Sequence, residues 1–219
     1  MAKYVIFGDS AFAERIHKYI SLEKSGDVLG FTNKESFITR KEINGVPVLP
    51  FERLLDFYDI ESFELLICIG YAQMNHLREQ IYHMCKNTGY KIGTWISKSD
   101  LIYSDDIDEG NIIMPGTLVG PTCHIGKCNI IASRVCISHD SIVGNFNFLS
   151  SSVTTGGFAK IGDNTFIGLN ATVKDAIKIE DYTLVGSAAN VLSSTLRAGI
   201  YIGNPARLIE GKKSIDVKI

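Results

Sequence analysis

Residues 119–190 read, in blocks of six, VGPTCH IGKCNI IASRVC ISHDSI VGNFNF LSSSVT TGGFAK IGDNTF IGLNAT VKDAIK IEDYTL VGSAAN. The first position of every block but one is Val, Ile or Leu, and the exception is Thr155. The same step of six runs from Leu101 to Val191 and gives sixteen positions in one register. A fixed short repeat of this kind is typical of a solenoid, in which each repeat buries its apolar side chain by stacking on its neighbours.

Two further positions of the repeat are in phase with the aliphatic one. Glycine follows the aliphatic position at Gly120, Gly126, Gly144, Gly156, Gly162, Gly168 and Gly186. Small or modest side chains recur four residues after it, at Thr117, Cys123, Ser141, Val153, Ala159, Thr165, Ala171, Thr183 and Ala189. Such a block forms one short strand and a tight bend, and three blocks close a triangular coil, so residues three blocks apart become neighbours. The sequence therefore predicts an all-β parallel β-helix over residues 96–195.

Residues 1–95 follow a different pattern. Residues 4–7 and 28–31 are short apolar runs, and an amphipathic helix is expected between them over residues 11–22. Another apolar run, 63–69, precedes apolar residues at helical spacing. Strands and helices that alternate in this order predict a small α/β domain with a Rossmann-like parallel sheet. Residues 196–219 remain as a C-terminal tail.

The carboxyl ends of the predicted parallel strands are the expected ligand edge of this domain. They correspond to residues 8–12, 31–34 and 70–73. The segment GDSAFA at 8–13 keeps only the first glycine of a dinucleotide fingerprint, and Asp9 would repel a pyrophosphate at the helix N-terminus. This argues against an NAD-dependent enzyme. Binding of a nucleoside, or a role in packing alone, remains open.

Composition excludes several classes of function. The net charge of −2, without blocks of Lys or Arg, gives no electrostatic footprint for nucleic acid or for an anionic membrane surface. No apolar run is long enough to span a membrane and there is no signal-peptide pattern, so a cytoplasmic protein is expected. The odd number of cysteines favours reduced thiols, and their spacing with His124 and His139 lacks the paired pattern of a closed zinc site. No metal is predicted; the cysteines are Cys68, Cys85, Cys123, Cys128 and Cys136.

Two histidines fall within the repeat. His139 follows the aliphatic Ile137 by two, which is a bend or outer position. A neutral imidazole there can serve as a general base near neutral pH, or can simply be solvated. His124 should stack beside Asp106, one coil away, as a surface contact. Two such histidines match poorly the three that zinc-dependent carbonic anhydrases of β-helix fold require.

The order of these parts resembles the bacterial nucleotide-sugar N-acetyltransferases of the left-handed β-helix, or hexapeptide-repeat, acyltransferase superfamily. The most specific segments are ISHDSIVGN at 137–145, FIGLNATV at 166–173 and GNPA at 203–206. The resemblance implies a left-handed β-helix, a homotrimer and acetyl-CoA as cosubstrate. It also implies a nucleotide-linked amino sugar as acceptor, for O-antigen or glycan biosynthesis.

The resemblance also implies roles for single residues. His139 corresponds to the general base and Asp140 to the acidic residue that tunes it. The positions that match the coenzyme A contacts between subunits are Gly157, Leu169 and Ser187. Those that match the nucleotide-sugar contacts are Ser10, Asn33, Gly70 and Tyr71. Two departures stand out: Phe148 occupies the place of a second histidine that family members often carry, and the first loop has lost glycines.

Other functions fit the same residues. The base could act on a hydroxyl, which would make the chain a sugar O-acetyltransferase of the sialic-acid type. A non-catalytic solenoid that binds a nucleotide sugar is the alternative of a different class. A purely structural solenoid would leave the N-terminal domain and His139 without an explanation.

Overall fold

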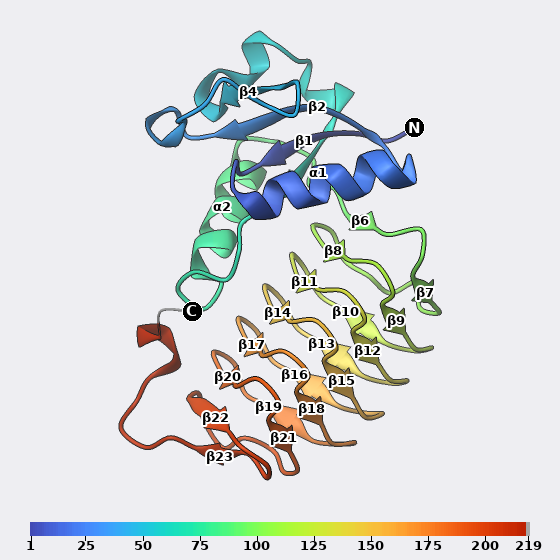
Figure 1. The fold of residues 1–219 in the computed structure, drawn as a ribbon, viewed down its shortest axis with the longest axis vertical. Coiled ribbons are helices and arrows are strands. Elements are labelled where there is room, and N and C mark those ends of the chain that lie inside the picture. The colour runs from blue at the N-terminus through green and yellow to red at the C-terminus, as the bar shows by residue number, and fades with distance from the viewer. Residues whose placement is uncertain (218–219) are drawn as a thin grey trace.

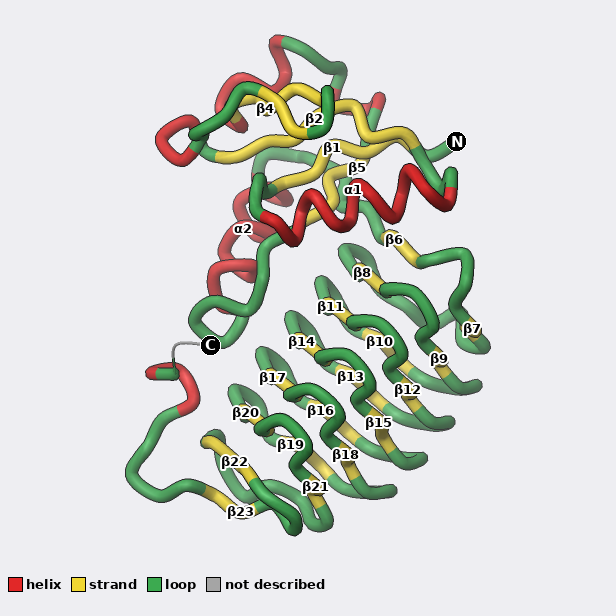
Figure 2. The backbone as a smooth tube through the Cα atoms, viewed as in Figure 1, coloured by secondary structure: helices red, strands yellow, loops and turns green. Residues whose placement is uncertain are grey.

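The computed structural model describes residues 1–217. An α/β layer lies at one end, and beside it a stack of coils made of short strands runs along the long axis of the molecule (Figure 1). Figure 2 shows these strands alternating with bends throughout the stack, while α1 and α2 belong to the α/β layer. None of the helices within residues 1–217 is long and apolar enough to cross a membrane.

The α/β layer contains a five-stranded sheet in the order β3-β4-β2-β1-β5. Its strands pair in parallel except for β3 and β4, which form an antiparallel pair. The strands are β1 (Lys3–Phe7), β2 (Asp27–Asn33), β3 (Glu42–Ile43), β4 (Val46–Pro50) and β5 (Glu64–Ile67). The helices are α1 (Ala11–Glu23) and α2 (His76–Asn87), with the short 3-10 helices η1 (Glu35–Phe37), η2 (Phe51–Asp56) and η3 (Ile60–Ser62).

Helix α1 packs between this sheet and the coils. Its buried residues Ala13, Ile16 and Ile20 recur at helical spacing, so they form one apolar stripe. The stripe belongs to a cluster that includes Ile6 and Phe31 of the sheet and, from the coils, Trp95, Ile112, Met114 and Ile130. The two parts of the molecule therefore share a continuous apolar core.

The coils consist of two-residue strands in three sheets. The strands are β6 (Trp95–Ile96), β7 (Leu101–Ile102), β8 (Ile112–Ile113), β9 (Leu118–Val119), β10 (His124–Ile125), β11 (Ile130–Ile131), β12 (Cys136–Ile137), β13 (Ile142–Val143), β14 (Phe148–Leu149), β15 (Thr154–Thr155), β16 (Lys160–Ile161), β17 (Phe166–Ile167), β18 (Thr172–Val173), β19 (Lys178–Ile179), β20 (Leu184–Val185) and β21 (Asn190–Val191). A four-stranded sheet has the order β10-β13-β16-β19, and a six-stranded sheet has the order β21-β18-β15-β12-β9-β7. The third, eight-stranded sheet faces the α/β layer and is called here the domain-facing sheet.

The predicted parallel β-helix is confirmed. Ile137 pairs in parallel with Val119 on one side and with Thr155 on the other, each three blocks of the repeat away. All three side chains are buried in the interior. Thr155, the one polar residue of the register, accepts a hydrogen bond on Oγ1 from the Ser138 backbone N–H at 3.2 Å. This contact gives the hydroxyl oxygen a hydrogen-bond partner inside the coil.

The first coil departs from the predicted register. Leu101 was expected in the interior, but it pairs with Leu118 and is 54% exposed. Ile102 pairs with Val119 instead and packs against the interior cluster. Ile102 and its partner Val119 are therefore separated by one residue less than three full blocks. The reason is that Ile102, and not Leu101, fills the single inward position of this strand. The prediction for Leu101 was wrong by one residue.

The C-terminal segment continues the domain-facing sheet. Strand β22 (Ile200–Ile202) pairs in parallel with β20, and β23 (Arg207–Leu208) pairs with β22 in the antiparallel sense. The 3-10 helix η4 (Ser214–Asp216) follows. These elements fall within residues 196–219, which the sequence suggested as a tail, and residues 218 and 219 lie outside the described residues.

Arg78 of α2 joins the α/β layer to the coils. Its side chain is 1% exposed and donates hydrogen bonds only to backbone carbonyls. Two of these carbonyls follow β5 and three belong to bends of the coils: Ile69, Gly70, Cys128, Phe146 and Asn147. Burial lowers the pKa of the Arg78 guanidinium to about 10, so it stays charged at neutral pH. The charge is therefore stabilised by carbonyl dipoles of both parts.

We expect Arg78→Met to destabilise the protein strongly. Each buried carbonyl left without a donor costs about 1–3 kcal/mol, so the loss should be about 3 kcal/mol or more. Urea unfolding at fixed protein concentration measures it. The control is Arg53→Met, because Arg53 is exposed and pairs only with Asp56, at 3.0 Å; we expect a change within about 0.5 kcal/mol for it. A loss below about 1 kcal/mol for Arg78→Met would contradict this role.

Candidate active site

His139 and Asp140 occupy the bend between β12 and β13. The His139 Nδ1 atom lies 2.8 Å from Asp140 Oδ2. The other carboxylate oxygen, Oδ1, accepts a hydrogen bond from Thr122 Oγ1 at 2.7 Å. An imidazole that donates from Nδ1 to a carboxylate keeps Nε2 free as the acceptor. Because the His139 side chain is 56% exposed, Nε2 can receive a proton from a bound molecule.

The hydrogen bonds also set the charge state of this pair. The Thr122 hydroxyl, and then His139, hold the pKa of Asp140 below its ordinary value. Asp140 is therefore an anion throughout the neutral range. A carboxylate fixed beside Nδ1 holds the ring in one orientation, with its proton on Nδ1.

Gly157 lies directly against the His139 ring, one coil further on. A Cβ at this position would lie 2.7 Å from Cε1 and 2.8 Å from Nε2 of the ring, so only glycine leaves the ring where it is. The Phe158 ring meets the imidazole edge-on at 5.3 Å. Gly157, which the resemblance assigns to the coenzyme, thus lies beside the histidine that it assigns as base.

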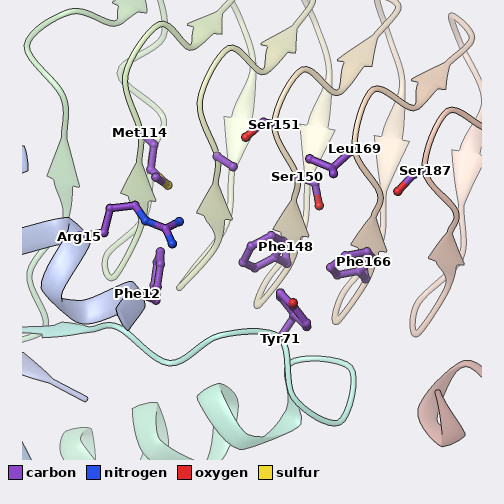
Figure 3. Close-up of a pocket in the computed structure, with 11 residues that line it drawn as sticks. Phe12, Arg15, Tyr71, Met114, Phe148, Ser150, Ser151, Phe166, Leu169 and Ser187 are labelled. Carbon is purple, nitrogen blue, oxygen red and sulfur yellow. The ribbon is translucent and has the colours of Figure 1, made fainter. Parts of the chain in front are cut away.

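A cavity of about 350 Å³ opens between the α/β layer and the domain-facing sheet. We call it the interdomain pocket; Figure 3 shows its lining side chains. Three of the predicted residues line it, namely Tyr71, Leu169 and Ser187. The remaining lining residues are Phe12, Arg15, Met114, Ala132, Phe148, Ser150, Ser151 and Phe166.

Aromatic rings form one wall of the interdomain pocket. Phe148 stacks on Phe166 with ring centroids 5.5 Å apart. Tyr71 meets both rings edge-on, at 4.9 Å and 5.0 Å. Phe148 therefore has packing partners of its own and belongs to the pocket wall, on a different sheet from the His139 bend.

A second cavity, of about 370 Å³, lies at the carboxyl ends of β1, β2 and β5. We call it the strand-end pocket. Asn33 lines it, and its amide donates to Asp9 Oδ1 at 2.9 Å. The other lining residues are Asp9, Lys34, Phe37, Ile69, Leu77 and Ile81. The Asp9 backbone carbonyl accepts a hydrogen bond from Arg40.

Ser10 and Gly70 line neither pocket, but they lie between the two. Asp9 borders the strand-end pocket and Phe12 the interdomain pocket, with the exposed Ser10 between them. On the neighbouring loop Ile69 and Tyr71 border the two pockets in the same way, with Gly70 between them. No atom lies within 4 Å of a Cβ built on Gly70, so the surface there is open. The two cavities flank the same pair of loops.

A single chain does not bring the predicted base to the pocket. The His139 bend joins the six-stranded to the four-stranded sheet. Leu169 and Ser187 lie on bends that join the domain-facing sheet to the six-stranded sheet. The width of the six-stranded sheet therefore separates the two groups within one copy of the chain.

The other histidine of the repeat behaves as expected. His124 Nδ1 lies 3.1 Å from Asp106 Oδ2, which confirms the stacked surface contact. The cysteines are free thiols, and burial raises the pKa of Cys85 and of Cys128 to about 12. Within residues 1–217 no group of three or more His, Cys, Asp or Glu side chains could hold a metal ion.

Comparison with known proteins bears on the fold. No protein-family model matches the chain. No curated protein matches it either. Solved structures do: the acetyltransferase domain of PglB from Neisseria gonorrhoeae, in complex with acetyl coenzyme A, has a TM-score of 0.83 and 19% identity, over 94% of this chain and 98% of that one.

Two further structures share the architecture. A histidine-to-asparagine mutant of perosamine N-acetyltransferase from Caulobacter crescentus, in complex with CoA and GDP-perosamine, has a TM-score of 0.83 and 21% identity, over 95% of this chain and 97% of that one. WeeI from Acinetobacter baumannii has a TM-score of 0.82 and 20% identity, over 95% of this chain and 100% of that one. At these identities the likeness establishes the fold: the chain shares the architecture of these solved structures, and it is the β-helix architecture that the sequence indicated.

We expect Thr122→Val to raise the pKa of Asp140 toward its ordinary value, because the hydroxyl that stabilises the carboxylate is removed. Carbon-13 NMR of the aspartate carboxyls during a pH titration measures this pKa. Since the pKa is depressed in the folded chain, the contact stabilises the fold above the pKa of the unfolded carboxyl, near 4, and is lost as the pH falls through the lower, folded pKa. Thr154→Val, at the exposed position of β15, is the control. An Asp140 titration unchanged by Thr122→Val would contradict this cause of the shift.

Proposed function

We propose that the chain is an N-acetyltransferase that moves acetyl from acetyl-CoA to the amino group of a nucleotide-linked aminodeoxy sugar, in the cytoplasm, for O-antigen or other glycan biosynthesis. The observation that carries the proposal is the His139–Asp140 pair, in which the Nδ1 contact of 2.8 Å leaves Nε2 free on an exposed bend of the coil. The likeness to solved structures that hold acetyl coenzyme A, or CoA with GDP-perosamine, supports the choice of both substrates.

The acceptor fits the strand-end pocket of the α/β part, a part that we regard as Rossmann-like, together with the interdomain pocket between this part and the coils. In this proposal the nucleoside occupies the strand-end pocket beside Asn33. The ligand then crosses the open surface over Ser10 and Gly70, and the sugar enters the interdomain pocket next to Tyr71. Each pocket, with about 370 Å³ and about 350 Å³, is large enough for one half of such a ligand.

The donor contacts are Gly157, Leu169 and Ser187. Acetyl-CoA, when bound, supplies a thioester carbonyl as the electrophile. Gly157 adjoins His139, whereas Leu169 and Ser187 line the interdomain pocket. In this proposal each chain therefore contributes one half of a site through His139 and Gly157, and one half of another site through the pocket. A homotrimer about a three-fold axis would set His139 and Gly157 of one copy against the pocket of the next.

His139 then acts as the general base. As the acceptor nitrogen attacks the thioester carbonyl, Nε2 takes the proton that this nitrogen must lose. The new C–N bond forms, the C–S bond breaks, and Nε2 passes its proton to the departing sulfur, which leaves as the CoA thiol and regenerates the base. Asp140 holds the Nδ1–H and stabilises the imidazolium, while it remains an anion itself.

We expect His139→Asn to lower kcat by roughly a hundredfold or more, because asparagine cannot accept the proton. His124→Asn is the matched control, since His124 also contacts an aspartate, at 3.1 Å, on the surface of the coil. The assay measures CoA release with amino and hydroxy versions of UDP-, dTDP- and GDP-linked sugars. Acetyl-CoA affinity and oligomeric state should stay unchanged in both variants.

The outcomes separate the candidate functions. Turnover of the amino sugar alone supports N-acetylation, whereas turnover of the hydroxy sugar alone would assign O-acetylation. Binding without CoA release would leave a non-catalytic nucleotide-sugar-binding solenoid. If His139→Asn kept more than about a tenth of the wild-type kcat, base catalysis by His139 would be excluded.

A further inference from the structure

The interdomain pocket carries one charged side chain. Of the residues that line it, only Arg15 is ionised at neutral pH, and none has a carboxylate. Figure 3 shows the guanidinium reaching from α1 toward the cavity, above the ring of Phe12. The polar groups that accompany it are hydroxyls, from Tyr71, Ser150, Ser151 and Ser187. The pocket is therefore positive and rich in hydrogen-bond donors, and it is complementary to an anion.

Arg15 has no partner within the part of the chain that the structure describes. Three other arginines form ion pairs: Arg40 with Glu14, Arg53 with Asp56 and Arg197 with Glu210. Glu14 is the residue next to Arg15, but its carboxylate is engaged by Arg40. The Arg15 fork of N–H groups is thus available to a ligand.

The nearest acidic group on the first loop faces the other cavity. Asp9 lines the strand-end pocket, where Asn33 donates to its carboxylate at 2.9 Å. Asp9 is therefore expected to repel a phosphate in the strand-end pocket and not in the interdomain pocket. On the interdomain side, the charged residue that α1 contributes to the pocket lining is Arg15.

We propose that Arg15 binds the diphosphate of the nucleotide-linked acceptor. This inference rests on the proposed function and adds the residue that holds the charged centre of the substrate. A diphosphate joins the nucleoside to the sugar, so it must lie where the two pockets adjoin, over Ser10 and Gly70. Arg15 lies just past this point, in the same pocket as Phe12.

The assignment also explains how the first loop could hold a diphosphate with only one glycine of the fingerprint. A glycine-rich loop holds phosphates with closely approaching backbone amides. In this chain the segment at 8–13 reads GDSAFA, and its side chains keep a phosphate further from the backbone amides than glycines would. A guanidinium compensates, because it forms two parallel, charge-assisted hydrogen bonds to phosphate oxygens.

The test is calorimetric titration of the full chain with UDP, dTDP, GDP and CoA. We compare the wild type with Arg15→Gln, Arg15→Lys and Lys18→Gln. Lys18→Gln is the matched control, because it removes the same charge as Arg15→Gln. Lys18 is exposed on α1 and lines neither pocket. Because Arg15 has no partner in the described residues, its variants should keep the wild-type circular dichroism and melting temperature.

We expect Arg15→Gln to weaken the best-bound nucleoside diphosphate by about tenfold or more. Arg15→Lys, which keeps the charge but not the fork, should fall in between. Lys18→Gln should stay within about twofold of wild type, and CoA affinity should not change in any variant. A loss of affinity for nucleoside diphosphate without a loss of affinity for CoA assigns Arg15 to the acceptor.

Three results would overturn the inference. If Arg15→Gln weakened CoA instead, the guanidinium would serve the donor. If it left nucleoside diphosphate affinity unchanged while the wild type bound one tightly, the Arg15 assignment alone would fail. If the wild type bound none of the three nucleoside diphosphates, the proposed acceptor and the Arg15 assignment would both fail.

Discussion

The parallel stacking of short strands from successive coils is the constraint on which the rest of the structure depends. Each coil buries one aliphatic side chain per strand, and burial of a Val, Leu or Ile contributes about 1.5–3 kcal/mol. The bends stack with the strands. At one of them Asn129, Asn147 and Thr165 donate their backbone N–H groups to side-chain oxygens one coil earlier, at 2.9, 2.8 and 2.7 Å. This ladder fixes the bends in one register, so a residue on a bend has a defined neighbour one coil away.

The site geometry follows from that register. Thr122 lies one full coil before Asp140, and Gly157 lies one full coil after His139, so stacking alone brings all four together. The interdomain pocket needs a second element, because its aromatic wall combines Tyr71 of a strand-end loop with Phe148 and Phe166 of the coils. Arg78 ties that loop to the coils through the Gly70 and Asn147 carbonyls, which keeps Tyr71 in place.

The sequence predicted those features that depend on local periodicity. The coil register, the inward Thr155 and the His124–Asp106 contact all follow from a step of six, and Thr122 could have been found by counting three blocks back from Asp140. Leu101 was misplaced because two adjacent apolar residues, Leu101 and Ile102, compete for one inward position at the start of the helix. The strand order of the α/β layer and its contact with the coils depend on long-range packing, which no local pattern reports.

The same limit applies to single side chains. Arg78 on an amphipathic helix is expected in solvent, and its five carbonyl partners are known only once two distant segments meet. The sequence did not point to Arg15 either. Within the described residues its guanidinium is free for a ligand because the neighbouring Glu14 pairs with Arg40, and this pair is visible only in the structure. The division of the site between two faces of the coil, with His139 on one bend and Ser187 on another, likewise required the sheet topology.

That division makes the central claim testable by mixing subunits. His139→Asn removes the base, and Ser187→Trp fills the exposed bend beside the interdomain pocket; each variant alone should be inactive. Co-expression with two affinity tags yields mixed oligomers, whose acetyl transfer to the amino sugar is then measured. If each site uses His139 of one copy and Ser187 of the next, every mixed trimer has one competent site out of three, so the purified mixed oligomers regain roughly a third of the wild-type activity. Mixed oligomers with no activity above the single variants would show that each chain holds a complete site, and would contradict the account.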